Sequence, residues 1–324
     1  MVEPFYIDTS GAWVLGHNQQ QGAGSHLQAG ARAELIPSPI TRALSTFGGR
    51  IAAQTMQYMF RGSVEPLLNY VAFRPYALME AIRFALGEHP RDKIVLDPAS
   101  GYSPVYYWLA QQLPHTQFIE MDQEKMIDGK HKALDPFGIA QNLGFHAVDL
   151  STTPLHTVQS NPVDVMVLLG AYVDHGAYAD LLRYVPHLLK QDGYIVSIFP
   201  NKEGIENFQE NSAIFSRIVS EPRGAVNDLS EIITLFKESE FKLKRVISLS
   251  ELADKHHKPV PADVELIAIA RLGGEDEVLI TRSEAPTATE SESVPPFIDF
   301  DLASFQRFPR HERQFPVPRR KPRL

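Results

Sequence analysis

The stretch spanning residues 93–104 constrains the fold of this chain more than any other, because it joins an apolar run, an acidic residue and a turn of small residues. Residues 94–96 are Ile, Val and Leu, the continuous apolar pattern of a strand at the centre of a parallel sheet. Asp97 ends that run, and Ala-Ser-Gly at residues 99–101 then permit a sharp turn and the close approach of a ligand. Ligands of open α/β sheets bind at the carboxyl ends of such strands, so the stretch predicts a binding site after Asp97.

A second acidic residue supports this interpretation. Residues 117–121 form the next strand-like run, and Asp122 follows it, 25 residues after Asp97. That separation is close to the roughly 20 residues at which an acid on the second strand reaches the ribose hydroxyls of a bound nucleotide. We therefore expect Asp122 to bind a ribose. The alternative is a surface acid that caps the following helix.

Strand-like and helix-like patterns alternate along the central part of the chain. Such alternation predicts an α/β protein with a doubly wound, mostly parallel sheet. Two late strands without a long crossover between them predict an antiparallel edge, which brings the sheet to seven strands. The expected strands are residues 93–97, 117–121, 145–148, 164–169, 194–199, 241–249 and 264–270.

The N-terminal part of the chain has helical patterns. A helix over residues 39–60 is expected to break at its Gly-Gly pair, and residues 16–26 are expected to form a linker or a mobile loop. A second helix over residues 64–86 contains Pro75, which should end or kink it just after Phe73. The neighbouring Arg74 is either a solvent-exposed arginine or a clamp for a carboxylate, since a guanidinium binds carboxylates bidentately.

Composition divides the chain into three expected segments. Residues 1–88 form an N-terminal extension and helical cap, residues 89–273 the α/β domain, and residues 274–324 an acidic linker with a basic and aromatic tail. The tail at residues 295–324 interleaves five phenylalanines with arginines, and its prolines keep it extended. Five phenylalanines exceed what a solvated linker needs, so a tail that docks on a protein partner or on the chain itself is one of two equally supported interpretations. A disordered tail with incidental charge is the alternative.

Composition also excludes several classes of function. The chain has no cysteine, which excludes disulfides, cysteine-based zinc sites and thiol nucleophiles. A net charge of −8 argues against nucleic-acid binding by bulk electrostatics. The first 15 residues lack the basic cluster of a signal peptide, and no apolar run approaches the roughly 20 residues of a membrane span. We therefore expect a cytoplasmic protein without membrane contact. His17 and His26 lack supporting carboxylates, so no metal site is expected.

Taken in order, these motifs resemble those of class I S-adenosylmethionine-dependent methyltransferases, over residues 64–271. Within that superfamily the sequence is most similar to the leucine carboxyl methyltransferase and polyketide O-methyltransferase group. The resemblance implies a Rossmann-like methyltransferase fold with S-adenosylmethionine as the cofactor and a small molecule as the substrate.

The resemblance also implies which residues bind the cofactor. Asp97, Ala99 and Gly101 occupy the group's acidic, glycine-rich turn, with Ala99 replacing its first glycine. Asp122 ends the second strand at the position of the ribose-binding acid. Arg74 matches the arginine that binds the methionine carboxylate of the cofactor in that group.

The third and fourth strands add further cofactor residues to this implied set. The pair Asp149 and Leu150 matches the residues that contact the adenine after the third strand. Leu169 lies where the group's fourth strand ends in Glu-Gly, so the acid of that motif is missing here.

Methyl transfer requires a nucleophile held in line behind the methyl group of a sulfonium, and the protein supplies proximity and orientation. Tyr172 and His175 follow the fourth expected strand and are the candidate catalytic residues. His175 would act as the base for a phenol or an alcohol, whereas a carboxylate substrate needs no base. Alternatively, His175 caps a helix or lies on the surface.

We therefore expect O-methylation of a small molecule or of a carboxylate. One alternative is a methyltransferase fold that has lost catalysis and serves as a binding or assembly subunit through its tail at residues 295–324. Another is a nicotinamide dehydrogenase, but residues 99–104 lack the Gly-x-Gly-x-x-Gly pattern that binds a pyrophosphate at a helix N-terminus.

Overall fold

The computed structural model describes ten stretches of the chain, all within one compact unit, Met1–Thr287. The tail at residues 295–324 therefore lies outside the described residues, and its expected partner stays a prediction. The described stretches are residues 6–7, 13–14, 21–36, 38–59, 65–150, 153, 155–168, 175–211, 228–250 and 264–273.

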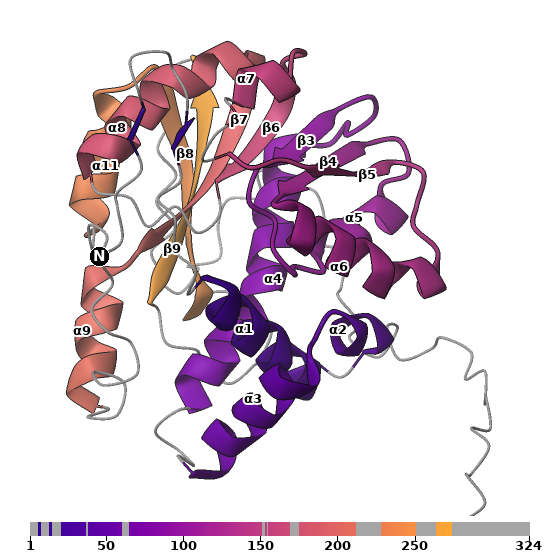
Figure 1. Ribbon diagram of the computed structural model, residues 1–324. Coiled ribbons are helices and arrows are strands. Elements are labelled where there is room, and N and C mark those ends of the chain that lie inside the picture. Colours follow the sequence, from indigo (N-terminus) through magenta and orange to yellow (C-terminus); the bar gives the residue numbers. More distant parts are fainter. Residues whose placement is uncertain are drawn as a thin grey trace, which may run out of the picture. The chain divides into compact units, whose positions relative to one another are not determined.

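A seven-stranded mixed sheet forms the centre of this unit (Figure 1). From one edge to the other its strands are β5 (Leu143–Ala147), β4 (Gln117–Asp122), β3 (Ile94–Asp97), β6 (Val163–Leu168), β7 (Leu189–Pro200), β9 (Glu265–Leu272) and β8 (Phe241–Ser248). The first five are parallel, and β9 is antiparallel to both of its neighbours. The predicted fold class, a doubly wound and mostly parallel sheet with an antiparallel edge, is confirmed. A separate antiparallel pair joins β1 (Tyr6–Ile7) to β2 (Trp13–Val14).

The strand order reverses at β3. The chain proceeds from β3 outward to β4 and β5, and then returns to place β6 on the other side of β3. In open α/β sheets the crevice at such a switch point, beyond the carboxyl ends of the strands, is where ligands bind. The reversal therefore places the turn after Asp97 at this crevice.

Helices cover the sheet and precede it. They are α1 (Gln21–Leu35), α2 (Pro39–Ala43), α3 (Phe47–Met59), α4 (Glu65–Leu86), α5 (Val105–Gln112), α6 (Glu124–Leu134), α7 (Leu155–Val158), α8 (His175–Tyr184), α9 (Lys202–Asn211) and α11 (Leu229–Lys237), with 3₁₀ turns η1 (Asp135–Phe137) and η2 (Val185–Leu188). None of the helices in the described stretches has the length and hydropathy of a membrane span.

Alternate residues of the strands face two different helical layers, as the pleat requires. Leu96 and Met121 belong to the core cluster that includes residues of α8 and α11. Their neighbours on the opposite face meet α5 and α6, where the ring of Phe118 packs at a tilt against Tyr106. In Figure 1, α5 and α6 lie beside the half of the sheet formed by β3, β4 and β5.

The N-terminal helices differ from the sequence prediction at two places. Helix α1 begins at Gln21, within the stretch predicted to be a linker. The break in the predicted helix over residues 39–60 falls between α2 and α3, and the Gly48-Gly49 pair lies inside α3. Tertiary packing explains both corrections, because α1 packs closely against α3: a Cβ atom on Gly30 would lie 2.2 Å from the carbonyl oxygen of Gly49.

Helix α4 continues through Pro75. Of the two predicted effects of this proline, the end of the helix near Phe73 is therefore wrong, and the kink stays a prediction. A proline inside a helix removes one backbone hydrogen bond. Residues on both sides of Pro75 are buried, Tyr70 and Val71 before it and Ala77 and Ile82 after it. Burial of this apolar face offsets the lost hydrogen bond and holds the helix together.

Candidate functional site

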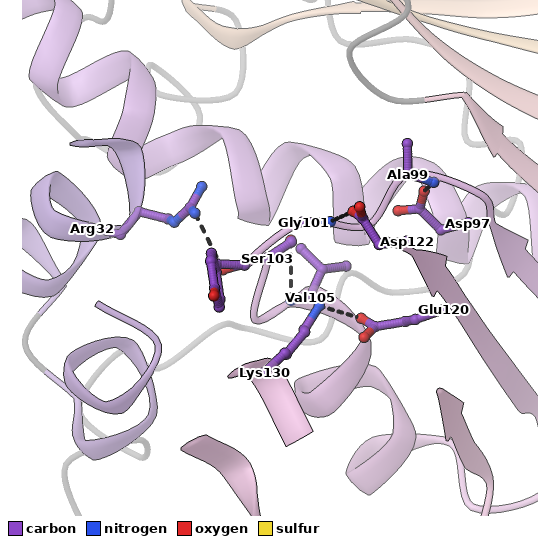
Figure 2. Close-up of polar contacts among 10 residues, drawn as sticks. Arg32, Asp97, Ala99, Gly101, Ser103, Val105, Glu120, Asp122 and Lys130 are labelled. Atoms are coloured by element: carbon purple, nitrogen blue, oxygen red, sulfur yellow. Dashed lines mark hydrogen bonds and ion pairs between the residues drawn. The ribbon is translucent and has the colours of Figure 1, made fainter. Parts of the chain in front are cut away.

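The turn after β3 is held by the carboxylate that ends the strand. Asp97 is fully buried, and its Oδ1 atom accepts a hydrogen bond of 2.9 Å from the backbone N–H of Ala99 (Figure 2). Gly101 follows with φ +52°, a left-handed conformation that glycine adopts without strain. A Cβ atom on Gly101 would meet no described atom within 4 Å, so the space beside it is open.

Asp122 ties the end of β4 to the same turn. Its Oδ2 atom accepts the N–H of Gly101 at 2.8 Å, and its Oδ1 atom accepts the N–H of Gln123 at 2.8 Å. The N–H of Ser100 also donates to the carbonyl of Met121, at 3.2 Å. The turn is thus bound to β4 through a side chain and through the backbone. The structure brings the sequence-predicted residues Asp97, Gly101 and Asp122 together.

A buried ion pair lies on the α6 side of these carboxylates. The ammonium of Lys130 is 2.7 Å from Oε1 of Glu120, and both side chains are almost wholly buried. The sequence analysis missed both residues. One signal was present, because Lys130 shares the buried face of α6 with Ile127 and Leu134. A lysine on such an apolar face indicates a buried partner.

Burial raises the pKa of each carboxyl in this group. The pKa of Asp97 rises to about 6, although the N–H of Ala99, the hydroxyl of Tyr106 and Lys130 act in the opposite direction. Burial likewise raises the pKa of Glu120 to about 7 against the pull of Lys130. The pKa of Asp122 also rises through burial. The hydroxyl of Tyr106 lowers the pKa of Asp97 through its proximity. Within the described structure, neither this hydroxyl nor Oδ2 of Asp97 makes an aligned hydrogen bond.

Arg32 reaches the turn from the last helical turn of α1. It is buried, and its guanidinium donates to the carbonyl of Tyr102 at 3.3 Å. Burial, reinforced by repulsion from Arg74, lowers the pKa of Arg32 to about 10, so the side chain is a cation at neutral pH. The sequence analysis missed this residue. No local signal could have found it, because Arg32 and Tyr102 are 70 positions apart.

Arg74 comes from the middle of α4 and faces the first residue of β9. Its Nε atom is 2.9 Å from Oε2 of Glu265, which is an ion pair by distance but not an aligned hydrogen bond. Glu265 pairs with Pro200 at the end of β7, so it lies at the same sheet edge as the carboxyl ends of the parallel strands. Arg74 therefore lies near the carboxyl ends of the parallel strands, where the binding site is predicted. Its role as a carboxylate clamp stays a prediction.

The remaining sequence-predicted residues are only partly described. Asp149 and Leu150 follow β5, next to the N–H of Val148, which donates to the carbonyl of Asp122 at 2.9 Å. The side chain of Leu150 is buried in the core. Leu169 and Tyr172 lie outside the described residues. His175 is the first residue of α8, and its side chain is likewise outside the described part.

No protein-family model and no curated protein matches this chain. Solved structures are similar over much of its length. The pyocyanin biosynthetic protein PhzM is 14% identical with a TM-score of 0.42, over 67% of this chain and 61% of PhzM. Magnesium protoporphyrin IX methyltransferase from Synechocystis, with bound SAH, is 13% identical with a TM-score of 0.46, over 62% of this chain and 84% of that protein. The plantazolicin methyltransferase BpumL in complex with SAH is 15% identical with a TM-score of 0.48, over 75% of this chain and 96% of BpumL. Similarity at this level does not assign the chain to a family.

Proposed function

We propose that this protein is an S-adenosylmethionine-dependent methyltransferase that acts on an oxygen atom of a small molecule or of a carboxylate. The turn after β3 carries the proposal. Two buried or half-buried carboxylates, Asp97 and Asp122, hold its backbone N–H groups at the switch point of the sheet. This is where open α/β sheets bind ligands that contain a nucleoside.

The carboxylate of Asp122 suits the nucleoside end of the cofactor. Each of its oxygens accepts one backbone N–H, and each keeps a lone pair for a ribose hydroxyl. The open space beside Gly101 admits a ligand close to the backbone. We assign the adenine to Asp149 and to the backbone of Leu150. These residues follow the end of β5, which pairs with β4 at Asp122. Ala99 and Leu169 complete the proposed cofactor-binding set.

The cationic pair of Arg32 and Arg74 suits the amino-acid end of the cofactor. The two guanidinium groups repel each other, and Glu265 supplies one negative charge beside Arg74. A ligand carboxylate near Arg32 would offset this repulsion by charge-assisted hydrogen bonds. We therefore assign the methionine carboxylate to Arg74, as the sequence indicates, with Arg32 as a second cation.

When bound, S-adenosylmethionine supplies a methyl group on a cationic sulfonium. The proposed role of the protein is to hold both ends of the cofactor, to exclude water and to orient the acceptor oxygen. We assign the orientation of the acceptor to Tyr172, and to His175 the uptake of its proton on a ring nitrogen. An acceptor that is already a carboxylate does not need that proton transfer.

Calorimetric titration of S-adenosylmethionine tests this proposal. We expect the wild type to bind and Asp122→Asn to bind about ten- to a hundredfold more weakly, because hydrogen bonds to charged groups contribute about 1.5–3 kcal/mol. Asp122→Asn keeps the shape of the side chain but loses its charge and one of its two acceptor oxygens. Circular dichroism and thermal unfolding show whether the variant is folded.

The matched control is Asp128→Asn, which removes an exposed carboxylate from α6, close in sequence to the site. Its affinity should equal that of the wild type. If folded wild type does not bind the cofactor, or if Asp122→Asn binds it equally well, the proposed function is wrong.

A further inference from the structure

A buried group of charges lies beneath the turn after β3. It consists of Asp97, Glu120, Asp122 and Lys130, which Figure 2 shows converging from two strands and α6. Lys130 is fully buried, and its ammonium is 2.7 Å from Glu120. The second oxygen of Glu120 has no hydrogen-bond partner in the described structure. Neither Glu120 nor Lys130 belongs to the residues assigned above to the cofactor.

The charges of this group do not balance. Three carboxylates repel one another: Asp122 acts on Asp97, and both act on Glu120. Lys130 is the cation that acts on all three of them. Tyr106 on α5 also faces Asp97 and Glu120, but its hydroxyl is uncharged. A buried carboxylate without a counter-ion takes up a proton, so the ionised state of the group depends on Lys130.

The ionised state matters for the shape of the turn. Asp97 and Asp122 hold the N–H groups of Ala99 and Gly101 by hydrogen bonds to carboxylate oxygens. Such bonds are roughly twice as strong when the acceptor is charged. Protonation of either carboxyl would therefore loosen the turn.

We propose that Lys130 is a positioning residue, whose ammonium keeps Asp97 and Asp122 ionised and thereby holds the turn at residues 99–101 in the shape that binds the cofactor. This inference rests on the proposed function for the ligand, while the control of ionisation belongs to the protein alone. Lys130 would thus strengthen cofactor binding by keeping the carboxylates ionised, without contact with the reacting atoms.

The inference predicts a shift in the pH dependence of binding. With Lys130 present, the pKa of Asp97 is about 6 and that of Glu120 about 7. Removal of the ammonium raises both pKa values further. In Lys130→Met the carboxyls are then protonated at neutral pH and ionise only at higher pH, so cofactor affinity should be low at neutral pH and recover in alkaline solution.

Titration calorimetry with S-adenosylmethionine, from about pH 5 to about pH 9, measures this shift. Because one pKa unit corresponds to a tenfold change in the ionised fraction, we expect Lys130→Met to bind about tenfold more weakly near neutral pH. Its affinity should approach that of the wild type at the alkaline end. Lys132→Met, which removes an exposed ammonium from the same helix, should follow the wild type at every pH.

Glu120→Gln provides a test in the opposite direction. It removes a repelling carboxylate and keeps the ammonium, so binding should persist to lower pH than in the wild type. This variant decides the question even if Lys130→Met does not fold. A uniform, pH-independent loss of affinity in Lys130→Met, or a wild-type pH profile in Glu120→Gln, would overturn the inference.

The ligand-free protein separates this inference from the proposed function. Carbon-detected NMR of the aspartate carboxyl groups follows the titration of Asp97 directly, and its apparent pKa should rise in Lys130→Met and fall in Glu120→Gln. An unchanged titration contradicts the inference whatever the protein binds. Failure of the wild type to bind S-adenosylmethionine at any pH contradicts the proposed function, while the NMR titration still decides whether Lys130 controls the carboxyls.

Discussion

Single residues set the geometry of the turn after β3, and Gly101 illustrates how. Its φ of +52° places it in the left-handed region, and its N–H is the group that Asp122 accepts. No described atom lies within 4 Å of the position where a Cβ would project. The requirement for glycine is therefore a matter of backbone strain and not of space. The sequence indicated a turn here, but not which residue carries the unusual φ.

Substitution of Gly101 tests this reading at the residue scale. Gly101→Ala should lower the free energy of unfolding by about 1–2 kcal/mol, because a left-handed conformation costs a Cβ-bearing residue about that much. Gly101→Asn should lose less, since asparagine tolerates this region better. Urea denaturation monitored by circular dichroism measures both variants. Equal losses for the two would show that contact with the side chain, and not φ, limits the position.

At the scale of elements, close packing decides where the N-terminal helices lie in the sequence. The contact between Gly30 on α1 and Gly49 on α3 brings the two backbones together. Glycines inside a helix lower its intrinsic propensity by about 1 kcal/mol each relative to alanine, so local rules predicted a break there. On the facing helix, the missing Cβ of Gly30 is what allows the backbone around Gly49 to approach. A tertiary contact thus reverses the meaning of a local signal.

A pair of substitutions separates these two effects. Gly30→Ala places a Cβ 2.2 Å from a backbone oxygen and should destabilise the protein by about 1–3 kcal/mol through overpacking. Gly48→Ala meets no atom within 4 Å and should leave the stability unchanged or raise it by up to about 1 kcal/mol, through helix propensity. Thermal unfolding of both variants is the measurement. Destabilisation by Gly48→Ala as large as that by Gly30→Ala would contradict the packing explanation.

At the scale of the whole molecule, the reversal of strand order at β3 gathers residues from distant parts of the sequence. Asp97 and Asp122 end adjacent strands, Glu265 begins the antiparallel β9 at the same edge, and Arg74 reaches it from α4. The fold also buries the carboxylates of Asp97 and Glu120 and half-buries that of Asp122, with one ammonium, that of Lys130, beside them. Because their pKa values are raised, this group affects the stability of the whole protein as the pH changes.

The contribution of Asp97 to stability should decrease as the pH rises. Its pKa is about 6 in the folded state and about 3.9 in an unfolded chain, so between these values the folded state holds a proton that the unfolded state has released. Stability therefore falls through this range and stays lower above it. The side chain of Asp97→Asn does not titrate. Between about pH 4 and pH 7, the free energy of unfolding of this variant should therefore rise by on the order of 1–3 kcal/mol relative to that of the wild type.

Urea denaturation at several pH values measures that difference. Asp128→Asn, on the exposed surface of α6, serves as the control and should show no such gain. A constant difference between Asp97→Asn and wild type across this range would show that Asp97 titrates normally in the folded protein.

Local sequence patterns were sufficient to predict the strands and their acidic ends. The apolar runs predicted β3, β4 and β6 within one residue of their observed bounds. The antiparallel edge was predicted because no long crossover was expected between the last two strands. These features are local, because burial on both faces of a strand imposes a continuous apolar pattern that can be read from a few residues. Asp97, Gly101 and Asp122 were found for the same reason, as they adjoin such strands.

The charges that meet at the site could not be predicted in the same way, because they depend on how distant elements pack. Arg32 on α1 donates to the turn at Tyr102, 70 residues away in the sequence. Lys130, on the buried face of α6, forms an ion pair with Glu120 on β4. Helix α4 passes through Pro75, and α3 includes its glycine pair, because packing outweighs propensities of a few kcal/mol. The physical reason is common to all of these cases: distance in space, on which electrostatic and packing energies depend, is not encoded by separation along the chain.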